Sequence, residues 1–332
     1  MEYFKPEYFD SFRCIAAACP DSSCKEWEVD IDPETAAYYR TLTGPLGERL
    51  RQVLRTTEDG TVMVIENGRC PMWRQDGLCR IQAELGHDAL SAVCREFPRL
   101  RHDYGDFVEL GLELSCPEAA RLILSSPIRA KIVTRAPGGD VPEYDTDVMA
   151  ILRRSRDEFL IFLSSNAYSV PETLAVLLLY GHAVQSELDG GVQAVLDPEQ
   201  TLQDAHKWAK SGDADAIFAF FRQLEILTPQ WKTRLQQVPV YAPWTDTFRN
   251  LAGYFIDRYW LQAVSDYDLI SRVKLTVVAC LLIHALGGDT IETAQLFSKE
   301  IENDPDNVDA ILDAAYTESA FTDVRILGLL LQ

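Results

Sequence analysis

Hydrophobic residues recur at two different periods along the chain. Beyond residue 146 they are spaced three and four positions apart, which is typical of amphipathic helices. The spacing predicts helices over 147–163, 171–188, 213–227, 248–264, 271–286 and 291–301. The C-terminal part, residues 147–332, is therefore predicted to be a helical domain.

The first 135 residues mix short helical and strand patterns. Asp32-Pro33 is a typical helix start, with Asp as the N-cap and Pro at the first helical position. Residues 61–65 are rich in β-branched side chains and precede the turn pair Asn67-Gly68, and hydrophobic residues alternate over 107–114. These patterns predict a small antiparallel sheet.

Together these patterns predict a mainly α protein with three parts. Residues 1–135 form an N-terminal cysteine-rich metal-binding module that contains a small β element. Residues 136–146 form a linker that begins with a run rich in Pro and Gly. Residues 147–332 form the C-terminal helical domain.

The charge balance narrows the classes of partner. The chain has 31 Lys+Arg and 51 Asp+Glu, a formal net charge of −20, and most of the excess acidity follows residue 135. This balance argues against a nucleic-acid binder, which needs basic surface to displace counterions from phosphates. Two interpretations stay open, namely a charge that keeps the protein soluble and an acidic surface that meets a basic partner.

No targeting segment is visible at the N-terminus, which lacks the basic and then apolar run of a signal peptide. The most apolar stretches, 174–180 and 275–286, are far shorter than the roughly 20 residues that span a bilayer. We therefore expect buried helices there, no membrane partner and a cytoplasmic protein.

Cysteines gather at the start of the chain. Seven of the eight lie in the first 116 residues: Cys14, Cys19, Cys24, Cys70, Cys79, Cys94 and Cys116. Cys280 lies in an apolar run and is expected to act as a small hydrophobic residue. Without a secretory signal, disulfides explain the clustering less well than thiolate ligation of a metal ion or an iron–sulfur cluster. Either one cubane cluster uses four of the seven thiols or there is more than one metal centre.

Local sequence predicts how two of these thiols are held. Ser115-Cys116-Pro117-Glu118 has the form of a capping box, with Ser as the N-cap and Glu three residues later. Cys116 is then expected in the first turn of a helix, where free N–H groups favour the thiolate. Cys94 is predicted to end a short helix over 89–93 that Pro98 stops.

Several motifs resemble one protein family. They are residues 6–14, Cys19-Pro20 through Asp32, Cys70-Pro71-Met72-Trp73 through Gln82, Cys94-Arg95-Glu96-Phe97-Pro98-Arg99, Leu114-Ser115-Cys116-Pro117-Glu118 through Arg121, and Phe297-Ser298-Lys299-Glu300-Ile301-Glu302-Asn303 with Asn307. The chain resembles the flagellin lysine N-methylases and, more loosely, other zinc- or iron-chelating cysteine-cluster domains. It departs from the family at Ser23, where a second cysteine is common, and at Asn303, where histidine is usual.

The resemblance implies methyl transfer from S-adenosylmethionine to lysine ε-amines of flagellin or another lysine-bearing protein. It also implies a [4Fe–4S] cluster, with zinc as the alternative metal, and the seven N-terminal cysteines are the candidate ligands. A lysine amine is nucleophilic only when neutral, and its ordinary pKa is about 10.4, so the site must desolvate or deprotonate it. No Gly-rich dinucleotide fingerprint and no Cys-x3-Cys-x2-Cys run is present. The rival hypotheses are a non-enzymatic zinc- or iron-binding structural or interaction protein, and a redox or metal-carrier protein.

Polar residues beside the cysteines are candidates for cofactor binding, while no catalytic residue is assigned. Trp27 either caps the core of the module or shields the cluster from water. Arg95, Arg99 and Arg121 either pair with surface carboxylates or balance the charge of the cluster and of the methionine carboxylate. We expect the reactive cleft between the module and the helical domain, with an acidic rim. Glu300 and Glu302 are two apart and are expected on different helix faces, with at least one exposed.

Overall fold

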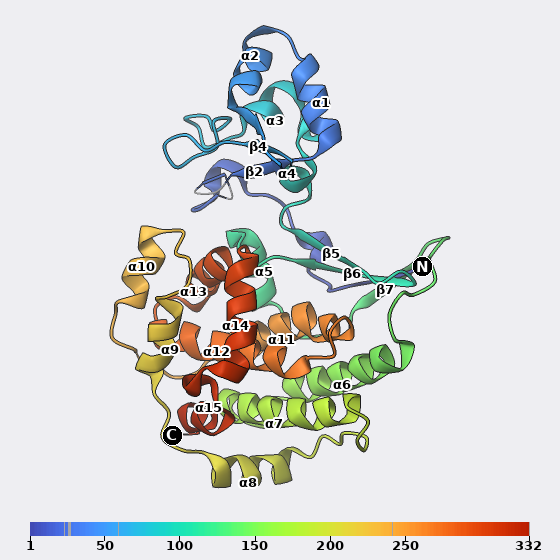
Figure 1. Ribbon diagram of the computed structural model, residues 1–332, viewed down its shortest axis with the longest axis vertical. Helices are drawn as coiled ribbons and strands as arrows, with labels where there is room; N and C mark the ends of the chain where they lie inside the picture. The colour runs from blue at the N-terminus through green and yellow to red at the C-terminus, as the bar shows by residue number, and fades with distance from the viewer. Residues whose placement is uncertain (23, 26–27, 59, 241, 332) are drawn as a thin grey trace.

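The computed structural model describes residues 1–331 apart from 23, 26–27, 59 and 241. A small lobe stands on a larger helical body, and the two are joined by short connecting segments (Figure 1). The mainly helical fold with a small sheet region is confirmed. Trp27 lies outside the described residues.

The small lobe combines a three-stranded sheet with short helices. Its antiparallel sheet has the order β2-β4-β3, from Val29–Ile31, Thr61–Met63 and Leu54–Thr56. The helices are α1 (Pro33–Thr41), α2 (Gly44–Val53), α3 (Arg80–Leu85) and α4 (Ala92–Glu96). Tyr39, Leu50 and Met72 are the most deeply buried large residues of its separate hydrophobic core.

Two local predictions in this lobe are confirmed. Asp32 caps α1 and accepts a hydrogen bond from the backbone N–H of Thr35 at 2.9 Å. Asn67 and Gly68 both have positive φ, 52° and 72°, and Glu66 and Arg69 exchange two backbone hydrogen bonds around them. This is the tight turn that the Asn-Gly pair predicts.

A second sheet covers one side of the helical body. Its order is β5-β6-β1-β7, from Arg99–Asp103, Phe107–Leu112, Glu2–Lys5 and Ile132–Arg135. The predicted strands over 61–65 and 107–114 both form antiparallel pairs, but they lie in different sheets rather than in one. The strand β1, which was not predicted, runs parallel to β6. Sequence periodicity reports which face of a strand is buried, and it does not reveal that the N-terminal strand inserts beside β6.

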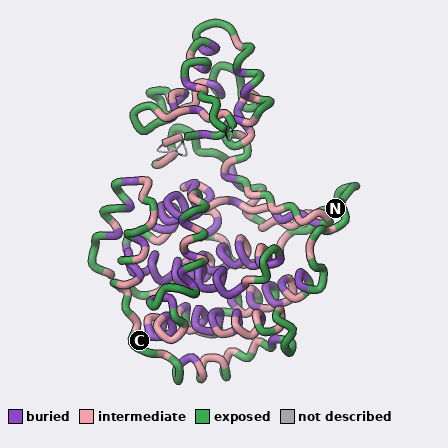
Figure 2. Tube along the Cα trace, in the orientation of Figure 1, coloured by how far each residue is buried: buried purple, intermediate pink, exposed green. Residues whose placement is uncertain are grey.

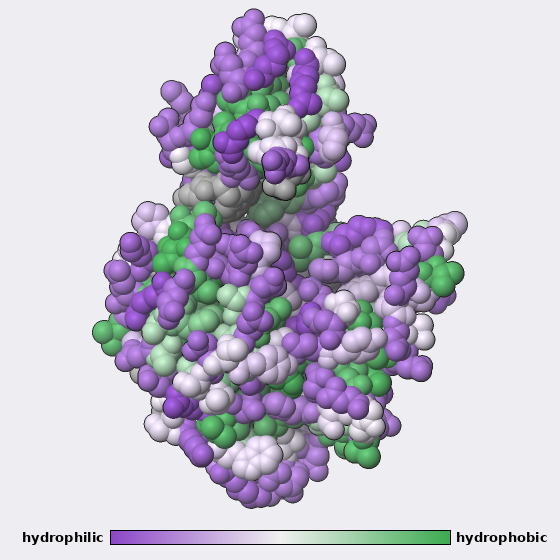
Figure 3. All heavy atoms as spheres, viewed as in Figure 1, coloured by the Kyte–Doolittle hydropathy of each residue, from purple (hydrophilic) through white to green (hydrophobic). Residues whose placement is uncertain are grey.

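The helical body is built around one buried helix, α12 (Leu269–Leu286), which packs against α7 (Val170–Leu188), α11 (Thr247–Tyr259) and α14 (Pro305–Thr317). Figure 2 shows the buried residues concentrated in this region, whereas exposed residues dominate the small lobe. Most of the face drawn in Figure 3 is hydrophilic. Among the described residues, only α12 is long and apolar enough to cross a bilayer, and all of it is buried within the protein.

The other helices of the body lie around this centre. They are α5 (Pro117–Ser125), α6 (Thr146–Ser164), α8 (Pro198–Trp208), α9 (Ala214–Phe221), α10 (Pro229–Leu235), α13 (Thr290–Phe297) and α15 (Asp323–Leu330), with the 3-10 turn η4 (Trp260–Val264) and the π-helix η5 (Ser298–Glu302). The helix predicted over 213–227 is shorter, and those over 248–264 and 291–301 change to 3-10 and π geometry in their last turns.

The two hydrophobic cores divide the chain at places other than residue 135. The core of the small lobe is made from residues between 29 and 90, whereas Phe12, Phe107 and Cys116 belong to the core of the helical body. The small lobe is thus an insertion between the N-terminal segment and β5. The domain division at residue 135 stays a prediction.

A buried ion cluster fastens the second sheet to the helices. Glu109 on β6 accepts two hydrogen bonds of 2.8 Å from Arg156 on α6, and its carboxylate also pairs with Lys131 at 3.1 Å. Burial acts to raise the pKa of Glu109, but the charges of Lys131 and Arg156 outweigh burial and lower the pKa to about 2. Glu109 therefore stays ionised inside the protein.

We predict that Glu109→Gln lowers the free energy of unfolding at pH 7 by about 3 kcal/mol, because it removes the buried carboxylate bonded to Arg156 and leaves only the longer contact to the exposed Asp157 at 3.7 Å. In the wild type this contribution is present above the unfolded pKa of about 4.5 and is lost as the pH falls toward 2. Urea unfolding from pH 7 to pH 3 measures both effects, and the variant should lack this part of the acid dependence.

Glu28→Gln is the matched control, because Glu28 pairs with Arg55 on the exposed surface. Its effect should stay below about 0.5 kcal/mol. Equal effects of the two variants would contradict a special role for the buried cluster.

Candidate functional site

Four of the predicted metal ligands surround the core of the small lobe. Cys70 is buried in that core, and Cys24 and Cys79 pack against it. The backbone N–H of Cys70 donates to the Cys24 carbonyl at 2.8 Å. Burial raises the pKa of the Cys70 thiol to about 12, and the nearby thiols of Cys24, Cys79 and Cys94 act in the same direction. We call these four residues the small-lobe thiols.

The other three N-terminal cysteines gather where the small lobe joins the body, and we call them the junction thiols: Cys14, Cys19 and Cys116. Cys116 belongs to the core of the body. Burial raises its pKa to about 11, and Cys19 and Cys14 add to this increase. The structure thus separates the seven cysteines into a group of four and a group of three, while Cys280 is fully buried in α12.

The donor set has the kind and number of ligands that a cubane cluster takes, since four thiols occur in one group. The arrangement of these thiols, however, is not that of a metal site. Among the described residues, no three Cys, His, Asp or Glu side chains are placed to hold a metal ion. The thiols as described therefore do not form a finished cluster site. The ligand set stays a prediction, and we derive no chemical step through a cluster.

The helix positions of two cysteines differ from the prediction. Cys94 lies inside α4, whose N-cap Ser91 accepts a hydrogen bond from the Cys94 backbone N–H. Cys116 is itself the N-cap of α5 rather than a residue of its first turn. Backbone N–H groups of Glu118 and Ala119 do lower the pKa of Cys116, but burial has the larger, opposite effect. The expectation of a thiolate overlooked the cost of burying the charge.

The arginines predicted to bind a cofactor have local partners. Arg121 forms two hydrogen bonds with Glu118 on the same helix, at 2.7 and 2.8 Å. Arg95 contacts the Glu96 carboxylate at 3.4 Å, and the Arg99 guanidinium lies over the Phe12 ring at 5.2 Å. Their role toward a cofactor stays a prediction.

A partly buried ion pair joins the entrance of the small lobe to the helical body beside the junction thiols. Asp21, on the segment that leads into the small lobe, pairs with Lys299 at 3.1 Å and accepts a hydrogen bond from Gln295 at 3.2 Å. Gln295 also donates to the Ser115 carbonyl at 2.8 Å, next to Cys116. Burial opposes ionisation of Asp21, but Lys299 contributes to a net lowering of its pKa. One carboxylate therefore holds the lobe entrance against α13 and the π-helix.

The π-helix carries a second polar centre around Glu302. Both Tyr254 and Tyr259 donate their hydroxyls to the Glu302 carboxylate, at 3.1 and 2.9 Å. Arg258 pairs with the same carboxylate at 3.2 Å and donates to the Tyr254 hydroxyl at 2.8 Å. Burial raises the pKa of Glu113, and Glu302 adds to this effect. These groups form a closed network that holds the segment before Cys116.

Sequence reasoning missed this network and was wrong about exposure, because both Glu300 and Glu302 are buried. Glu300 accepts a hydrogen bond from the backbone N–H of Leu227 at 2.8 Å and another from the Thr228 hydroxyl. One signal was available: Tyr254 and Arg258 are four apart on a predicted helix and share a face. The expectation that the two glutamates point in different directions is correct.

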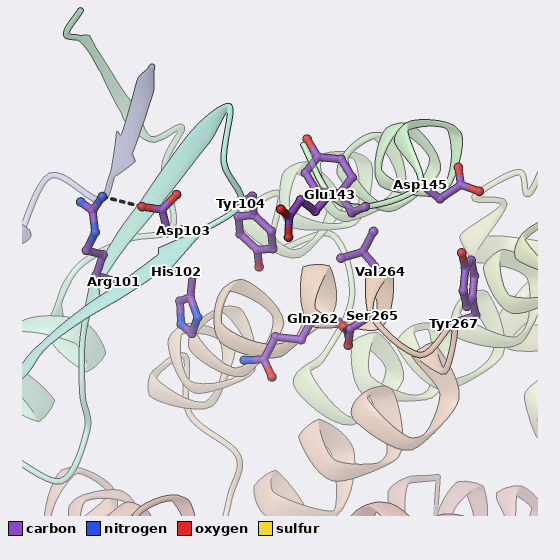
Figure 4. Close-up of a pocket in the computed structure, with 11 residues that line it drawn as sticks. Arg101, His102, Asp103, Tyr104, Glu143, Asp145, Gln262, Val264, Ser265 and Tyr267 are labelled. Carbon is purple, nitrogen blue, oxygen red and sulfur yellow. Dashed lines mark hydrogen bonds and ion pairs between the residues drawn. The ribbon is translucent and has the colours of Figure 1, made fainter. Parts of the chain in front are cut away.

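An open pocket of about 720 Å³ lies between the end of β5 and η4. Its lining residues are Arg101, His102, Asp103, Tyr104, Glu143, Tyr144, Asp145, Gln262, Val264, Ser265 and Tyr267 (Figure 4). The pocket lies among a strand of the predicted module, the linker and the helical body. Its rim is acidic, but no cysteine lines it. The position of the reactive cleft beside the cysteines stays a prediction.

The fold and these sites define a class: a mainly helical protein with a cysteine-rich lobe inserted near its N-terminus and a buried acidic motif near its C-terminus. The chain is 32% identical over 136 residues to the flagellar biosynthetic protein FliU of Salmonella muenchen, a match that covers 37% of this chain and 77% of FliU. On this relationship, the chain belongs to the flagellin lysine N-methylase family.

The same identity, 32% over 136 residues, relates the chain to the lysine-N-methylases of Salmonella typhimurium and Salmonella choleraesuis. These matches cover 37% of this chain and 32% of each relative, so the chain spans about a third of their length. No family model and no solved structure matches the chain.

We predict that Glu302→Gln lowers the free energy of unfolding by about 3 kcal/mol, because it removes the carboxylate that neutralises Arg258 inside the body. Tyr259→Phe, which removes one hydrogen bond of the same network, should cost about 1 kcal/mol. Urea unfolding at pH 7 measures both. Glu318→Gln alters an exposed residue and should change little; a loss as large as that of Glu302→Gln would contradict this assignment.

Proposed function

We propose that this protein is a protein-lysine N-methyltransferase. The observation that carries the proposal is membership of a family in which two relatives bear the name lysine-N-methylase. The family motifs also lie at structurally connected places. The cysteine motifs build the small lobe and the junction, and the C-terminal motif builds the π-helix that pairs with Asp21 at the junction. We take S-adenosylmethionine as the methyl donor.

The proposed reaction is a direct displacement. The lone pair of a neutral lysine Nζ attacks the methyl carbon of S-adenosylmethionine, the carbon–sulfur bond breaks, and its electrons remain on sulfur as S-adenosylhomocysteine forms. The amine gives up one proton to become N-methyl-lysine. Because free lysine is protonated at pH 7, the protein must favour the neutral amine by desolvation or through a base. No side chain is assigned that role.

Flagellin is the proposed substrate, with another lysine-bearing protein as the broader class. The name of FliU refers to flagellar biosynthesis, and the net charge of −20 suits a partner that presents lysines. The open acidic pocket is accessible to a side chain carried by another protein, whereas a sealed cavity is not.

We further propose that the small-lobe thiols hold a metal centre, either a [4Fe–4S] cluster or zinc. The small lobe has a separate core that Cys70 helps to build, so a metal there stabilises the lobe whether or not it takes part in chemistry. The alternative function, a non-enzymatic zinc- or iron-binding interaction protein, keeps the metal and lacks methyl transfer.

The decisive experiment combines metal analysis with a methylation assay on anaerobically purified protein. We expect labelled methyl from S-adenosylmethionine to enter co-expressed flagellin, and a cubane cluster to give a broad absorption near roughly 400 nm. Stoichiometric zinc without methyl transfer would support the non-enzymatic alternative. Inactivity with an intact iron–sulfur centre would reject flagellin as the substrate.

Cysteine variants test which thiols matter. We predict that Cys70→Ala and Cys94→Ala lose the metal, because each removes one of four ligands, whereas Cys280→Ala keeps metal and activity and costs only about 1 kcal/mol of stability. Metal content by atomic spectroscopy and methyl incorporation are scored together. Cys116→Ala tests whether the junction thiols ligate the same metal centre as the small-lobe thiols, as the sequence motifs imply. Loss of the metal supports one shared centre. Retention of the metal shows that the two groups of thiols are separate.

A further inference from the structure

A second pocket lies inside the helical body, among α9, α12 and α15. Its volume is about 250 Å³. The described residues that line it include no cysteine and none of the residues that line the open pocket at the end of β5. Figure 1 shows the three helices in the helical body, below the small lobe. A ligand in this pocket is therefore separate from the thiols and from the open pocket.

Three helices line this pocket with hydrophobic side chains. α9 contributes Ile217 and Phe218, which are 2% and 1% exposed, and α12 contributes Leu281 and Leu282. Leu330 of α15 forms part of a third wall. No Lys, Arg, Asp or Glu is among the described lining residues. An apolar cavity of about 150 Å³ is large enough for benzene, so this larger pocket has room for two fused rings.

The segment before α11 forms the remaining wall and is fastened to the end of α12. The backbone N–H of Val240 donates to the Ala285 carbonyl at 2.7 Å. The Ala242 carbonyl lies 2.6 Å from Nε2 of His284, and the Trp244 ring stacks on the His284 ring with centroids 3.8 Å apart and planes at 3°. Ala242 is exposed and Trp244 is half-buried, so the pocket is accessible from this side. The position of the His284 ring is thus fixed on two sides.

His284 brings one hydrogen-bond acceptor to the pocket. The side chain belongs to the lining, and the residue is only 8% exposed. A carbonyl oxygen can only accept, so Nε2 carries the hydrogen that is donated to Ala242. Burial lowers the pKa of His284, so the ring is neutral at pH 7 and Nδ1 keeps a lone pair. Within the described residues no donor reaches Nδ1, and a buried acceptor without a donor is unfavourable.

We propose that this pocket binds an uncharged aromatic molecule of about two fused rings that carries one N–H or O–H donor. The donor bonds to Nδ1 of His284, and the rings pack against Phe218, Trp244 and the aliphatic walls, since aromatic rings attract one another edge to face. A charged ligand is disfavoured, because the described lining offers its charge no partner. The site is independent of the proposed methyl transfer.

Two probes of nearly the same shape test the hydrogen bond. They are 5-fluoroindole and 5-fluorobenzothiophene, in which sulfur replaces the N–H. Titration of the full chain followed by 19F NMR measures the dissociation constant of each. We expect saturable binding of the indole and about tenfold weaker binding of the benzothiophene, which leaves Nδ1 of His284 without a donor. His284→Phe should make the two dissociation constants equal, mainly by weakening the indole.

A second pair of variants tests the pocket itself. Ala214 lies half-buried in the lining on α9, so the larger side chain of Ala214→Leu should narrow the pocket and weaken both probes at least tenfold. The matched control is Ala219→Leu, because Ala219 is exposed on the same helix and is not among the described lining residues. It should bind both probes as the wild type does. Circular dichroism and the unfolding midpoint show that each variant is folded.

Three results would each overturn the proposal. They are a wild type that does not bind 5-fluoroindole saturably, equal binding of the two probes by the wild type, and unchanged binding by folded Ala214→Leu. The first two results use the wild type alone, so they decide the question even where a variant does not fold.

Discussion

Burying charge in the helical body imposes the constraint on which the arrangement of the lobes depends. Each buried ion must find a partner, because an unpaired charge in the interior costs several kcal/mol. The π-helix Ser298–Glu302 carries three such ions, and each reaches a different segment of the chain. Lys299 holds the entrance of the small lobe through Asp21, and Glu300 holds the start of α10 through Thr228.

Glu302 completes this arrangement by gathering both tyrosines and the arginine of α11. In a π turn each hydrogen bond joins a backbone N–H to the carbonyl five residues earlier. Such a turn interrupts a regular α-helix, often at functional positions. Here the π turn lets the side chains of neighbouring charged residues point in separate directions. The segment before Cys116 is fixed as a result, since the Leu114 N–H meets the Tyr254 hydroxyl. The C-terminal family motif therefore helps to position the junction thiols.

Most of the fold follows from local patterns, which the sequence displays directly. The pattern of hydrophobic residues located α6, α7 and α12 within two residues at each end, because these helices are long and rich in buried apolar residues. Shorter helices such as α8 and α10 were missed, since they have few turns and bury few residues. The parallel pairing of β1 was not predictable, because it depends on a contact between residues a hundred positions apart.

The candidate sites were predicted less completely than the fold. Clustering in sequence marked the cysteines, but the division into small-lobe and junction thiols arises from two separate cores, which spacing does not reveal. Glu143 and Tyr267 carry no motif at all. Both line one pocket because the linker and the segment after η4 approach the end of β5, so only the folded chain brings them to it.

The place of β1 also determines the order in which the chain is able to fold as it is synthesised. Glu2 pairs with both Phe107 and Arg135, so the first strand has no partner in its sheet until β6 has left the ribosome, and its second partner follows only at residue 135. The small lobe closes earlier, because its strands and core lie between residues 29 and 90 and its contacts are local. A nascent chain thus carries a finished lobe behind an unpaired strand, which is the kind of segment that chaperones shield from aggregation.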